Sequence, residues 1–551
     1  MKLQLFFAKL GLVLLGAFLF MLCQPNELVP NGIGFLAFIA LIPFFVLASI
    51  VPLKTAALWG GLYGAVAHAF LVLWLFRFSP AAFLGIAFLY FCFFAILTPL
   101  LRICTKAFGE KAFFAQWILY LGYEYVKTRG FAGFAYGVLG YSQWKFTALL
   151  PVASLFGVWA VSALTVFPSA FFAAFLVRFL SERKNGPHNA EKIFLKKFCC
   201  FLQDKKFFVI GYGILFLLSF LPFFFRPSLE GEKHKIALIQ PNSDPWKSGV
   251  LNYGNDLDVL IRLSKAALDE HEKLSLVVWP ETAFVPRIKW HYRFRPDEAT
   301  FSLVNTLLDF LDTQDVPFLI GNDEALYDAA RAGIGSDLEA GRVDYNAALL
   351  FLPGQNVRPP TPEYYYKQRL VPFTESFPYK RTLPFVYDFL LHADTHLYEA
   401  GTEAKVFTVN GLQFSVPICF EDNFGYITRE FAKNGCQMLI NISNDAWSKS
   451  AACQMQHVST SVFRAVETGL PLLRATANGF TCYINPDGKV VQKLPAFEQG
   501  FLTVECIVPN GSKTLYTKVG DILGRFFVFA GVITTGFALF THKKKQSICV
   551  E

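Results

Sequence analysis

Long runs of apolar residues constrain the fold of this chain more than any other feature of its sequence. A helix crosses the hydrocarbon core of a bilayer with about 20 mostly apolar residues. Eight runs of this kind occur, at residues 5–23, 33–52, 55–76, 81–101, 112–128, 148–179, 207–225 and 519–540. Only 17% of the residues are charged, whereas soluble domains carry roughly 25%. The sequence therefore predicts a membrane protein with several helical spans.

The uneven placement of these runs predicts three parts. Residues 1–227 hold seven of the runs and are expected to form a transmembrane domain of about seven helices. Residues 228–515 have the composition of an ordinary globular domain. Residues 516–551 are expected to form a last transmembrane helix and a basic cytoplasmic tail. No small-residue cleavage site follows the first run, so we expect this helix to be retained rather than removed as a signal peptide.

The basic residues between the runs predict the orientation in the membrane, because lysine and arginine are enriched in cytoplasmic loops. With Lys2 inside, eight spans also place inside the loop around Arg102 and Lys106, the segment 181–198 and the tail 542–546. Both termini are then cytoplasmic, and the globular domain lies on the opposite side of the membrane, which for a bacterial chain would be the periplasm. The net charge of +8 follows from this topology and does not indicate nucleic-acid binding.

The cysteines and glycines give no sign of a bound metal or cofactor. The sequence has 11 cysteines but no CxxC pair and no Cys/His spacing typical of a zinc site. It also lacks a glycine-rich phosphate loop. We therefore expect no cofactor. The cysteines of the globular domain are odd in number, so at least one thiol cannot pair within the chain; they are Cys419, Cys436, Cys453, Cys482 and Cys506.

Short apolar segments that end in turns alternate with helical patterns in the globular domain. Segments such as LSLVVWPET, VPFLIGND, VPICFED and CQMLINISNDAW are typical of buried strands, and NDLDVLIRLSKAALDEHEK and QHVSTSVFRAVETG have apolar residues at helical spacing. This alternation predicts an α/β sandwich. In such sheets, functional side chains gather in the turns at the carboxyl ends of the strands.

Three of the predicted strand ends carry a reactive side chain, namely Glu281, Lys367 and Cys419. Acyl transfer by a thiol needs a base, a group that stabilises the oxyanion, and shielding from water. A glutamate, a lysine and a cysteine supply these functions without a histidine. An ammonium close to Cys419 is expected to lower the pKa of the thiol. Taken singly, each residue has an ordinary explanation: packing for the cysteine, a cap or salt bridge for the glutamate, surface exposure for the lysine.

Five motifs in a fixed order carry a resemblance: LVVWPET, YYKQRLVPFTESFP, VPICFED, NISNDAW and QHVSTSVFRAVETGLPLLRATANG. Together they resemble the carbon-nitrogen hydrolase (nitrilase) superfamily. Within it, the chain resembles the apolipoprotein N-acyltransferase family, which comprises integral membrane enzymes that add the third acyl chain to bacterial lipoproteins. The resemblance covers nearly the whole chain. It implies a nitrilase-like α-β-β-α sandwich next to a multi-span helical membrane domain.

The resemblance also implies a role for each matching residue. Glu281 matches the general base, Lys367 the lysine that stabilises the oxyanion, and Cys419 the nucleophile. Asp422 is expected on a solvated turn. For one of the further pocket residues, Trp447, burial at a sheet edge is the alternative to contact with lipid. The residues expected to line the pocket are Glu375, Phe420, Glu421 and Trp447.

The reaction implied by the resemblance is a ping-pong acyl transfer. A membrane phospholipid donates the acyl chain to Cys419, which forms a thioester. The acceptor is the N-terminal α-amine of the diacylglyceryl-cysteine of an apolipoprotein. The partners are therefore two lipid substrates and the bilayer itself, and we expect a monomer.

Two other classes of function stay open at this stage. A membrane-anchored amidase or nitrilase would use the same three residues with water as the second nucleophile, and would release a free acid or ammonia. A transporter or receptor would use the globular domain only to bind a ligand. Against this second class, the apolar runs lack the sets of paired charges and the broken helices that mark transport paths.

Overall fold

The computed structural model describes residues 2–183, 190–224, 230–271, 273–332, 338–392, 395–509 and 513–548. The chain forms two compact units, one from residues 1–227 and 519–551 and the other from residues 228–518. Part of the predicted basic loop, residues 184–189, lies outside the described residues, and so does the predicted boundary at residue 227.

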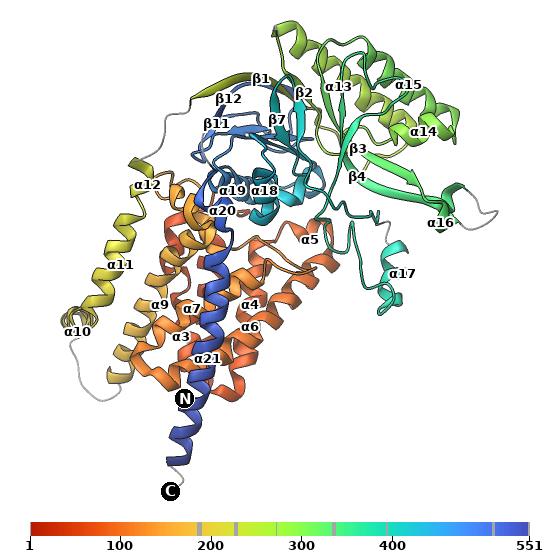
Figure 1. The fold of residues 1–551 in the computed structure, drawn as a ribbon. Helices are drawn as coiled ribbons and strands as arrows, with labels where there is room; N and C mark the ends of the chain where they lie inside the picture. Colours follow the sequence, from red (N-terminus) through yellow and green to blue (C-terminus); the bar gives the residue numbers. More distant parts are fainter. Residues whose placement is uncertain are drawn as a thin grey trace. The chain divides into compact units, whose positions relative to one another are not determined.

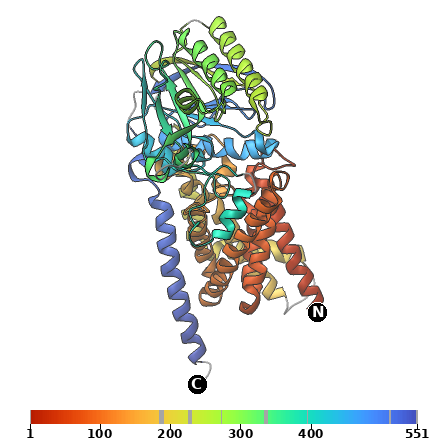
Figure 2. The ribbon, with the colours of Figure 1, turned by 90° about the vertical axis from the view of Figure 1, so that its right-hand side faces the viewer.

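In the described residues of the first unit, all regular elements are helices or short 3-10 turns. Its longer helices lie at the places where apolar runs occur in the sequence. In Figure 2 they run roughly side by side, with the dark blue helix α21 at one edge. The longer helices are α1 (Lys2–Cys23), α3 (Ile42–Ile50), α4 (Leu53–Leu71), α6 (Pro80–Phe108), α7 (Ala112–Val126), α9 (Val158–Arg183), α10 (Ala190–Asp204), α11 (Lys206–Leu218) and α21 (Ile522–Ile548). The short ones are α2 (Ala37–Ala40), α5 (Leu75–Phe78), α8 (Ala153–Phe156) and α12 (Leu221–Phe224).

Within the described ranges, five helical stretches are long and apolar enough to cross a membrane. One of them, Pro80–Val126, contains two of the eight predicted spans, because only the short 3-10 turn Gly109–Lys111 separates α6 from α7. The predicted span at 33–52 forms a shorter apolar helix, Gly34–Ile50. The chain thus has the helices of a membrane protein, and the count of eight spans stays a prediction.

Helix α4 is not among the five stretches, although an apolar run predicts a span there. Its glycines account for its close packing. A Cβ atom at Gly60 would lie 2.0 Å from Thr98 Oγ1, and one at Gly64 would lie 2.4 Å from the carbonyl oxygen of Tyr90. Both neighbours belong to α6. Small residues that let two helix backbones approach are a common feature of helix packing in membranes.

The second unit contains two six-stranded sheets (Figure 1). The strand order is β12-β1-β2-β3-β4-β5 in one sheet and β11-β10-β9-β8-β7-β6 in the other. The strands are β1 (Gly231–Gln240), β2 (Leu276–Val278), β3 (Phe318–Tyr327), β4 (Arg342–Phe351), β5 (Glu363–Tyr366), β6 (Phe407–Val409), β7 (Leu412–Ser415), β8 (Met438–Ser443), β9 (Leu472–Thr476), β10 (Cys482–Ile484), β11 (Val490–Lys493) and β12 (Gly500–Pro509).

Helices accompany each sheet, as the predicted α/β sandwich requires. Figure 1 shows α13, α14 and α15 grouped next to β3 and β4, and α18 and α19 next to the other sheet. Apolar residues of α13 and α15 share one core cluster with the first sheet, including Leu260, Leu307 and Trp279. The helices of this unit are α13 (Val250–Glu270), α14 (Ile288–Phe294), α15 (Glu298–Asp312), α16 (Ala329–Ala332), α17 (Pro384–His392), α18 (Gly425–Lys433), α19 (Ala451–Thr468) and α20 (Leu515–Val519).

The central strands read as apolar runs because both of their faces are covered. All six residues of β8 and all three of β2 are buried, which is typical of parallel strands inside a layered fold. The long strand β12 was not predicted. It pairs antiparallel with β1 from Gly231 opposite Pro509 to Gln240 opposite Gly500. Its residues are only partly buried, so it lacks the continuous apolar run by which the central strands were found.

Candidate active site

The three predicted reactive residues all follow strands, as expected from the sequence. Glu281 lies three residues after the end of β2, and Lys367 follows β5 directly. Cys419 begins the 3-10 turn η6 (Cys419–Asn423), one residue after an isolated bridge between Ile418 and Ile442. Short strands or bridges therefore precede all three side chains, and the backbone N–H of Lys367 still donates to the carbonyl oxygen of Asn346 on β4.

Lys367 lies between two carboxylates in the interior of the second unit. Its Nζ atom is 2.9 Å from Glu281 Oε1 and 2.9 Å from Glu375 Oε1. The lysine side chain is 1% exposed, and the side chains of Glu281 and Glu375 are 7% and 15% exposed. The structure thus joins the predicted general base, the predicted oxyanion-stabilising lysine and one predicted pocket residue in a single ion cluster.

Neutral donors complete the coordination of the two carboxylates. Asn346 Nδ2 donates to Glu281 Oε1 at 2.8 Å and to Glu375 Oε1 at 3.1 Å. The backbone N–H of Asn444 donates to Glu281 Oε2 at 2.9 Å, and that of Val371 donates to Glu375 Oε2 at 2.7 Å. Both glutamates are therefore held in one orientation by strands, a turn and the lysine.

The charges around Lys367 keep it an ammonium. Burial alone would lower the pKa of this lysine, but the carboxylates of Glu281 and Glu375 outweigh burial and raise the pKa well above its usual value. A buried lysine without such partners would tend to lose its proton. Lys367 is thus a fixed positive charge within the cluster.

Cys419 is buried, with 8% of its surface exposed, and here the sequence-based expectation was wrong. Lys367 does favour the thiolate, but burial of the sulfur and the nearby charge of Glu281 together raise the pKa of the Cys419 thiol well above its usual value. A hydrogen bond with Ser443 favours the thiolate without reversing this result. These surroundings favour the neutral thiol at Cys419, and a neutral thiol needs a base in order to act as a nucleophile.

Glu421 connects the turn that bears Cys419 to the segment that bears Lys367. Its carboxylate accepts hydrogen bonds from the backbone N–H of Ile418 (2.7 Å), Gln368 (2.7 Å) and Arg369 (3.0 Å). The Tyr365 hydroxyl donates to it at 2.8 Å. Burial raises the pKa of Glu421 to about 7, although these donors favour the carboxylate. Glu421 thus holds the backbone at Ile418 and the backbone at Gln368 and Arg369 together.

The other predicted positions have different surroundings. The ring of Phe420 is buried and meets the ring of Phe424 edge-on, with centroids 5.0 Å apart. Trp447 is half-buried on the 3-10 turn η7 (Ala446–Ser448), three residues after Asn444. The expectation of a solvated turn at Asp422 was wrong. This residue is fully buried because ion pairs with His457 and Arg474 compensate for its lost hydration.

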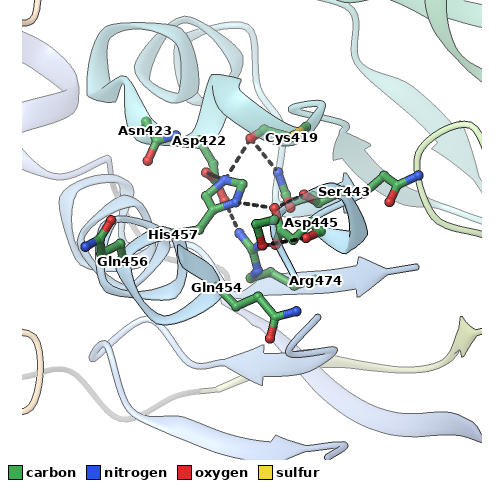
Figure 3. Close-up of polar contacts among 12 residues, drawn as sticks. Cys419, Asp422, Asn423, Ser443, Asp445, Gln454, Gln456, His457 and Arg474 are labelled. Carbon is green, nitrogen blue, oxygen red and sulfur yellow. Dashed lines mark hydrogen bonds and ion pairs between the residues drawn. The ribbon is translucent and has the colours of Figure 1, made fainter. Parts of the chain in front are cut away.

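Figure 3 shows this second polar cluster, which sequence reasoning missed. Besides Asp422, it contains Asp445, His457 and Arg474, all buried. The run of polar residues in α19 was the signal for this cluster in the sequence. The structure buries every residue of this helix from Ala452 to Thr468. Buried polar side chains need hydrogen-bonding partners, and a histidine on such a helix finds them when it lies next to two acids.

The described part of the chain holds no group of three or more histidine, cysteine, aspartate or glutamate side chains suited to a metal ion. It also holds five buried cysteines in this unit, Cys419, Cys436, Cys453, Cys482 and Cys506. The site places a buried thiol near a carboxylate and an ammonium. This arrangement is suited to nucleophilic attack on a carbonyl carbon.

Comparison with known proteins identifies both units. Residues 235–510 match the carbon-nitrogen hydrolase family, and residues 15–171 match the apolipoprotein N-acyltransferase N-terminal domain. Apolipoprotein N-acyltransferase 1 of Treponema denticola is 42% identical over 99% of this chain and 99% of its own length. Its namesake in Treponema pallidum is 43% identical over 95% of this chain and 94% of its own length.

A more distant relative and a solved structure match as well. The apolipoprotein N-acyltransferase of Borreliella burgdorferi is 28% identical over 95% of both chains. Among solved structures, Nit3 of Saccharomyces cerevisiae, a member of the nitrilase superfamily, matches with a TM-score of 0.35 and 16% identity. That match covers 54% of this chain and 97% of the yeast chain.

Proposed function

Because this chain belongs to the apolipoprotein N-acyltransferase family, we propose that it moves an acyl chain from a membrane phospholipid to a lipoprotein through a thioester on Cys419. Family membership makes the chain a membrane-bound acyltransferase of lipoprotein N-acylation. The phospholipid donor, the thioester and the roles of single residues are the proposal. The observation that carries it is the ion cluster of Glu281, Lys367 and Glu375 next to a buried neutral thiol.

In the first half-reaction, Glu281 accepts the proton of the Cys419 thiol while the sulfur attacks an ester carbonyl of the phospholipid. The negative charge that develops on the carbonyl oxygen is stabilised by the Lys367 ammonium and by backbone N–H groups. Collapse of the tetrahedral intermediate breaks the ester C–O bond. The leaving alkoxide takes the proton from Glu281 and departs as a lysophospholipid, which leaves the acyl chain on sulfur.

In the second half-reaction, the α-amine of a diacylglyceryl-cysteine attacks the thioester carbonyl. Glu281 again accepts a proton, now from the attacking nitrogen, and Lys367 again faces the oxyanion. The C–S bond then breaks, and the thiolate of Cys419 recovers its proton from Glu281. The product is an amide. A thiol of raised pKa leaves less readily as a thiolate, and transfer of the proton from Glu281 to sulfur as the C–S bond breaks offsets this effect.

The supporting residues have the task of keeping the charges in place. Glu375 holds Lys367 through a second ion pair of 2.9 Å. Asn346 donates to both glutamates and so keeps their oxygens directed at the lysine. Glu421 fixes the distance between the lysine segment and the nucleophile turn. We assign lining of the lipid pocket to Phe420 and Trp447.

The proposal includes a location and a state of assembly. The chain lies in the inner membrane of a bacterium, with both termini cytoplasmic and the second unit on the periplasmic side, and it acts as a monomer. The distribution of lysine and arginine among the loops supports this orientation. Both substrates are lipids, which gives a reason for joining the catalytic unit to a membrane unit.

A two-substrate assay separates this proposal from the amidase alternative. Purified full-length protein in detergent is given phospholipid with a labelled acyl chain and a synthetic diacylglyceryl lipopeptide with a free α-amine. We expect the label in an amide at the lipopeptide N-terminus, and no transfer when the α-amine is acetylated. Release of the label only as free fatty acid, at the same rate with and without lipopeptide, would instead favour a hydrolase. A binding protein would release no label at all.

A further inference from the structure

A buried cluster of alternating charges lies next to the nucleophile turn, and the reaction described above uses none of its members. It consists of Asp422 on η6, Asp445 just before η7, His457 on α19 and Arg474 on β9, and we name it the clamp network (Figure 3). No member is more than 2% exposed. Two acids and two bases buried together demand an explanation, since each ion loses its hydration.

The contacts form a closed circuit. His457 Nδ1 lies 3.0 Å from Asp445 Oδ1, and His457 Nε2 lies 2.6 Å from Asp422 Oδ1. Arg474 closes the circuit, with Nη1 at 2.5 Å from Asp422 Oδ2 and Nη2 at 3.2 Å from Asp445 Oδ2. Each carboxylate therefore bridges the histidine and the arginine. With His457 protonated, the cluster carries no net charge.

The clamp network reaches the backbone of the nucleophile. His457 Nε2 is 3.0 Å from the carbonyl oxygen of Cys419, and Asn441 Nδ2 donates to the same oxygen at 3.4 Å. This carbonyl needs holding, because Cys419 has a φ angle of +49°. A residue other than glycine in the left-handed region costs of order 1–3 kcal/mol, and such a conformation persists only when the surrounding structure imposes it.

Holding this carbonyl also orients the next amide. In a trans peptide the C=O and N–H groups point in opposite directions. When His457 and Asn441 fix the carbonyl of Cys419, the N–H of Phe420 is directed away from both of them. The proposed reaction requires backbone N–H groups for the oxyanion, and the amide that follows the nucleophile is the nearest one in the chain.

The clamp network also reaches the sulfur of the nucleophile. Ser443 Oγ donates to Asp445 Oδ1 at 3.1 Å, and the same hydroxyl interacts with the Cys419 thiol. Asp445 Oδ1 therefore contacts both His457 Nδ1 and the Ser443 hydroxyl, which lies beside the sulfur of Cys419. Both ends of Cys419, the carbonyl and the side chain, are thus connected to the histidine.

We propose that His457 is a positioning residue for the acyl transfer, which as an imidazolium clamps the Cys419 carbonyl, directs the Phe420 N–H toward the oxyanion, and balances the charge of Asp445 near the sulfur. The inference rests on the proposed function, because it assumes that Cys419 is the nucleophile. The imidazolium is essential to it, since only the protonated ring donates from both nitrogens.

The charges that face His457 support its protonated state. Burial lowers the pKa of this histidine, but Asp422 and Asp445 outweigh burial and the repulsion of Arg474, and they raise the pKa to about 9. At neutral pH the ring is therefore charged. Loss of the charge would leave a net negative cluster near the sulfur, where Asp445 already disfavours the thiolate.

Three variants of the full-length protein test the role of His457. His457→Leu removes the donor and the charge, and His457→Gln keeps one donor but no charge. His271→Leu is the matched control, because this histidine lies in the same unit at the surface, next to Glu270. We measure the rate at which phospholipid acylates the protein, as a function of lipid concentration and pH, together with the unfolding temperature.

We expect His457→Leu to lower the maximal acylation rate about 10- to 100-fold, which corresponds to one lost hydrogen bond to a buried group, with a KM for phospholipid within about threefold of the parent. His457→Gln recovers part of the rate, and His271→Leu matches the parent. The ratio of the parent rate to the His457→Gln rate shrinks as the pH rises through 9, because the parent then loses its imidazolium. A folded His457→Leu protein with the parent rate would overturn the proposal, and so would a ratio that is constant with pH.

A lipid-free measurement keeps this inference separate from the proposed function. Iodoacetamide labelling of Cys419, followed at the peptide level from pH 6 to 10, requires no acyl donor. If the parent forms no acyl-enzyme, the proposed reaction fails, but labelling still reports on the clamp. We expect the labelling curve of His457→Gln to be displaced to higher pH, since the thiolate loses the compensating charge. A curve identical to that of the parent would refute the clamp. If His457→Leu does not fold, the Gln variant alone decides the question.

Discussion

Replacing Lys367 with methionine separates two tasks of this residue, the pairing with two carboxylates that the structure shows and the proposed stabilisation of the oxyanion. The lysine holds the charges of Glu281 and Glu375 together in the interior, at 2.9 Å from each. Methionine has a similar length but no charge, so both carboxylates would remain buried with only Asn346 and backbone donors. Breaking a buried ion pair in this manner costs about 3–5 kcal/mol.

The same substitution removes the ammonium that is proposed to face the oxyanion. Loss of one such donor typically lowers a rate about 10²- to 10³-fold. We therefore expect Lys367→Met to unfold at lower temperature than the parent and to form acyl-enzyme at least about 100-fold more slowly. Both quantities are measured on purified full-length protein, by thermal unfolding in detergent and by intact mass after incubation with phospholipid.

Two companion variants assign the cause of each effect. Lys405→Met removes a partly exposed lysine whose Nζ is 2.8 Å from Glu363 Oε2, and a solvent-accessible pair of this kind contributes only about 0–1 kcal/mol. Lys367→Met combined with Glu375→Gln removes one of the two orphaned charges, so it should regain part of the stability but none of the rate. A folded Lys367→Met protein that acylates within tenfold of the parent would refute the assigned role.

Three further predictions follow from the same contacts. Glu375→Gln leaves Glu281 as the remaining charged partner of Lys367 and should slow acyl-enzyme formation about tenfold, which corresponds to roughly 1.4 kcal/mol, in the mass assay; an unchanged rate would show that Glu281 alone holds the lysine. Glu421→Gln replaces an acceptor that binds three backbone N–H groups. It should lower the unfolding temperature more than Glu403→Gln, a change at an exposed position. Equal effects of the two variants would contradict the role of Glu421 in holding two backbone segments together. His457 has a pKa raised from 6.5 to about 9, so its contribution to stability is fully present below pH 6.5 and is lost as the pH rises through 9. At 1.36 kcal/mol per pKa unit this contribution amounts to about 3 kcal/mol. When unfolding temperatures are measured from pH 6 to 10, those of the parent and of His457→Gln should converge at the alkaline end.

The sequence predicted that Glu281 and Lys367 follow strands because strand ends leave a clear pattern. Each follows a short run of apolar or aromatic residues, and the structure places Glu281 after the buried strand β2 and Lys367 after the partly exposed strand β5. The polar partners left weaker signals. Asn346 stands out only as one amide in an apolar strand, and Asn444 contributes its backbone N–H, which no side-chain pattern reveals.

Electrostatic effects were harder to predict than positions. The expectation of a lowered pKa for Cys419 considered Lys367 alone, but the structure also places Glu281 near a sulfur that is buried. The sign of a pKa shift depends on every charge within a few ångströms and on burial. Asp422 illustrates the same point, since its partners His457 and Arg474 come from positions 35 and 52 residues away if counted along the printed sequence.

Intact-mass analysis of the purified protein after incubation with phospholipid alone tests the central claim most directly. The parent is compared with Cys419→Ala and with Cys436→Ala, which removes another buried thiol of the same unit. We predict a gain of one acyl chain in the parent and in Cys436→Ala, its release by hydroxylamine, and no gain in Cys419→Ala. An adduct that persists in folded Cys419→Ala protein would contradict a thioester on Cys419, and so would the absence of any adduct in a parent that transfers acyl chains to lipopeptide.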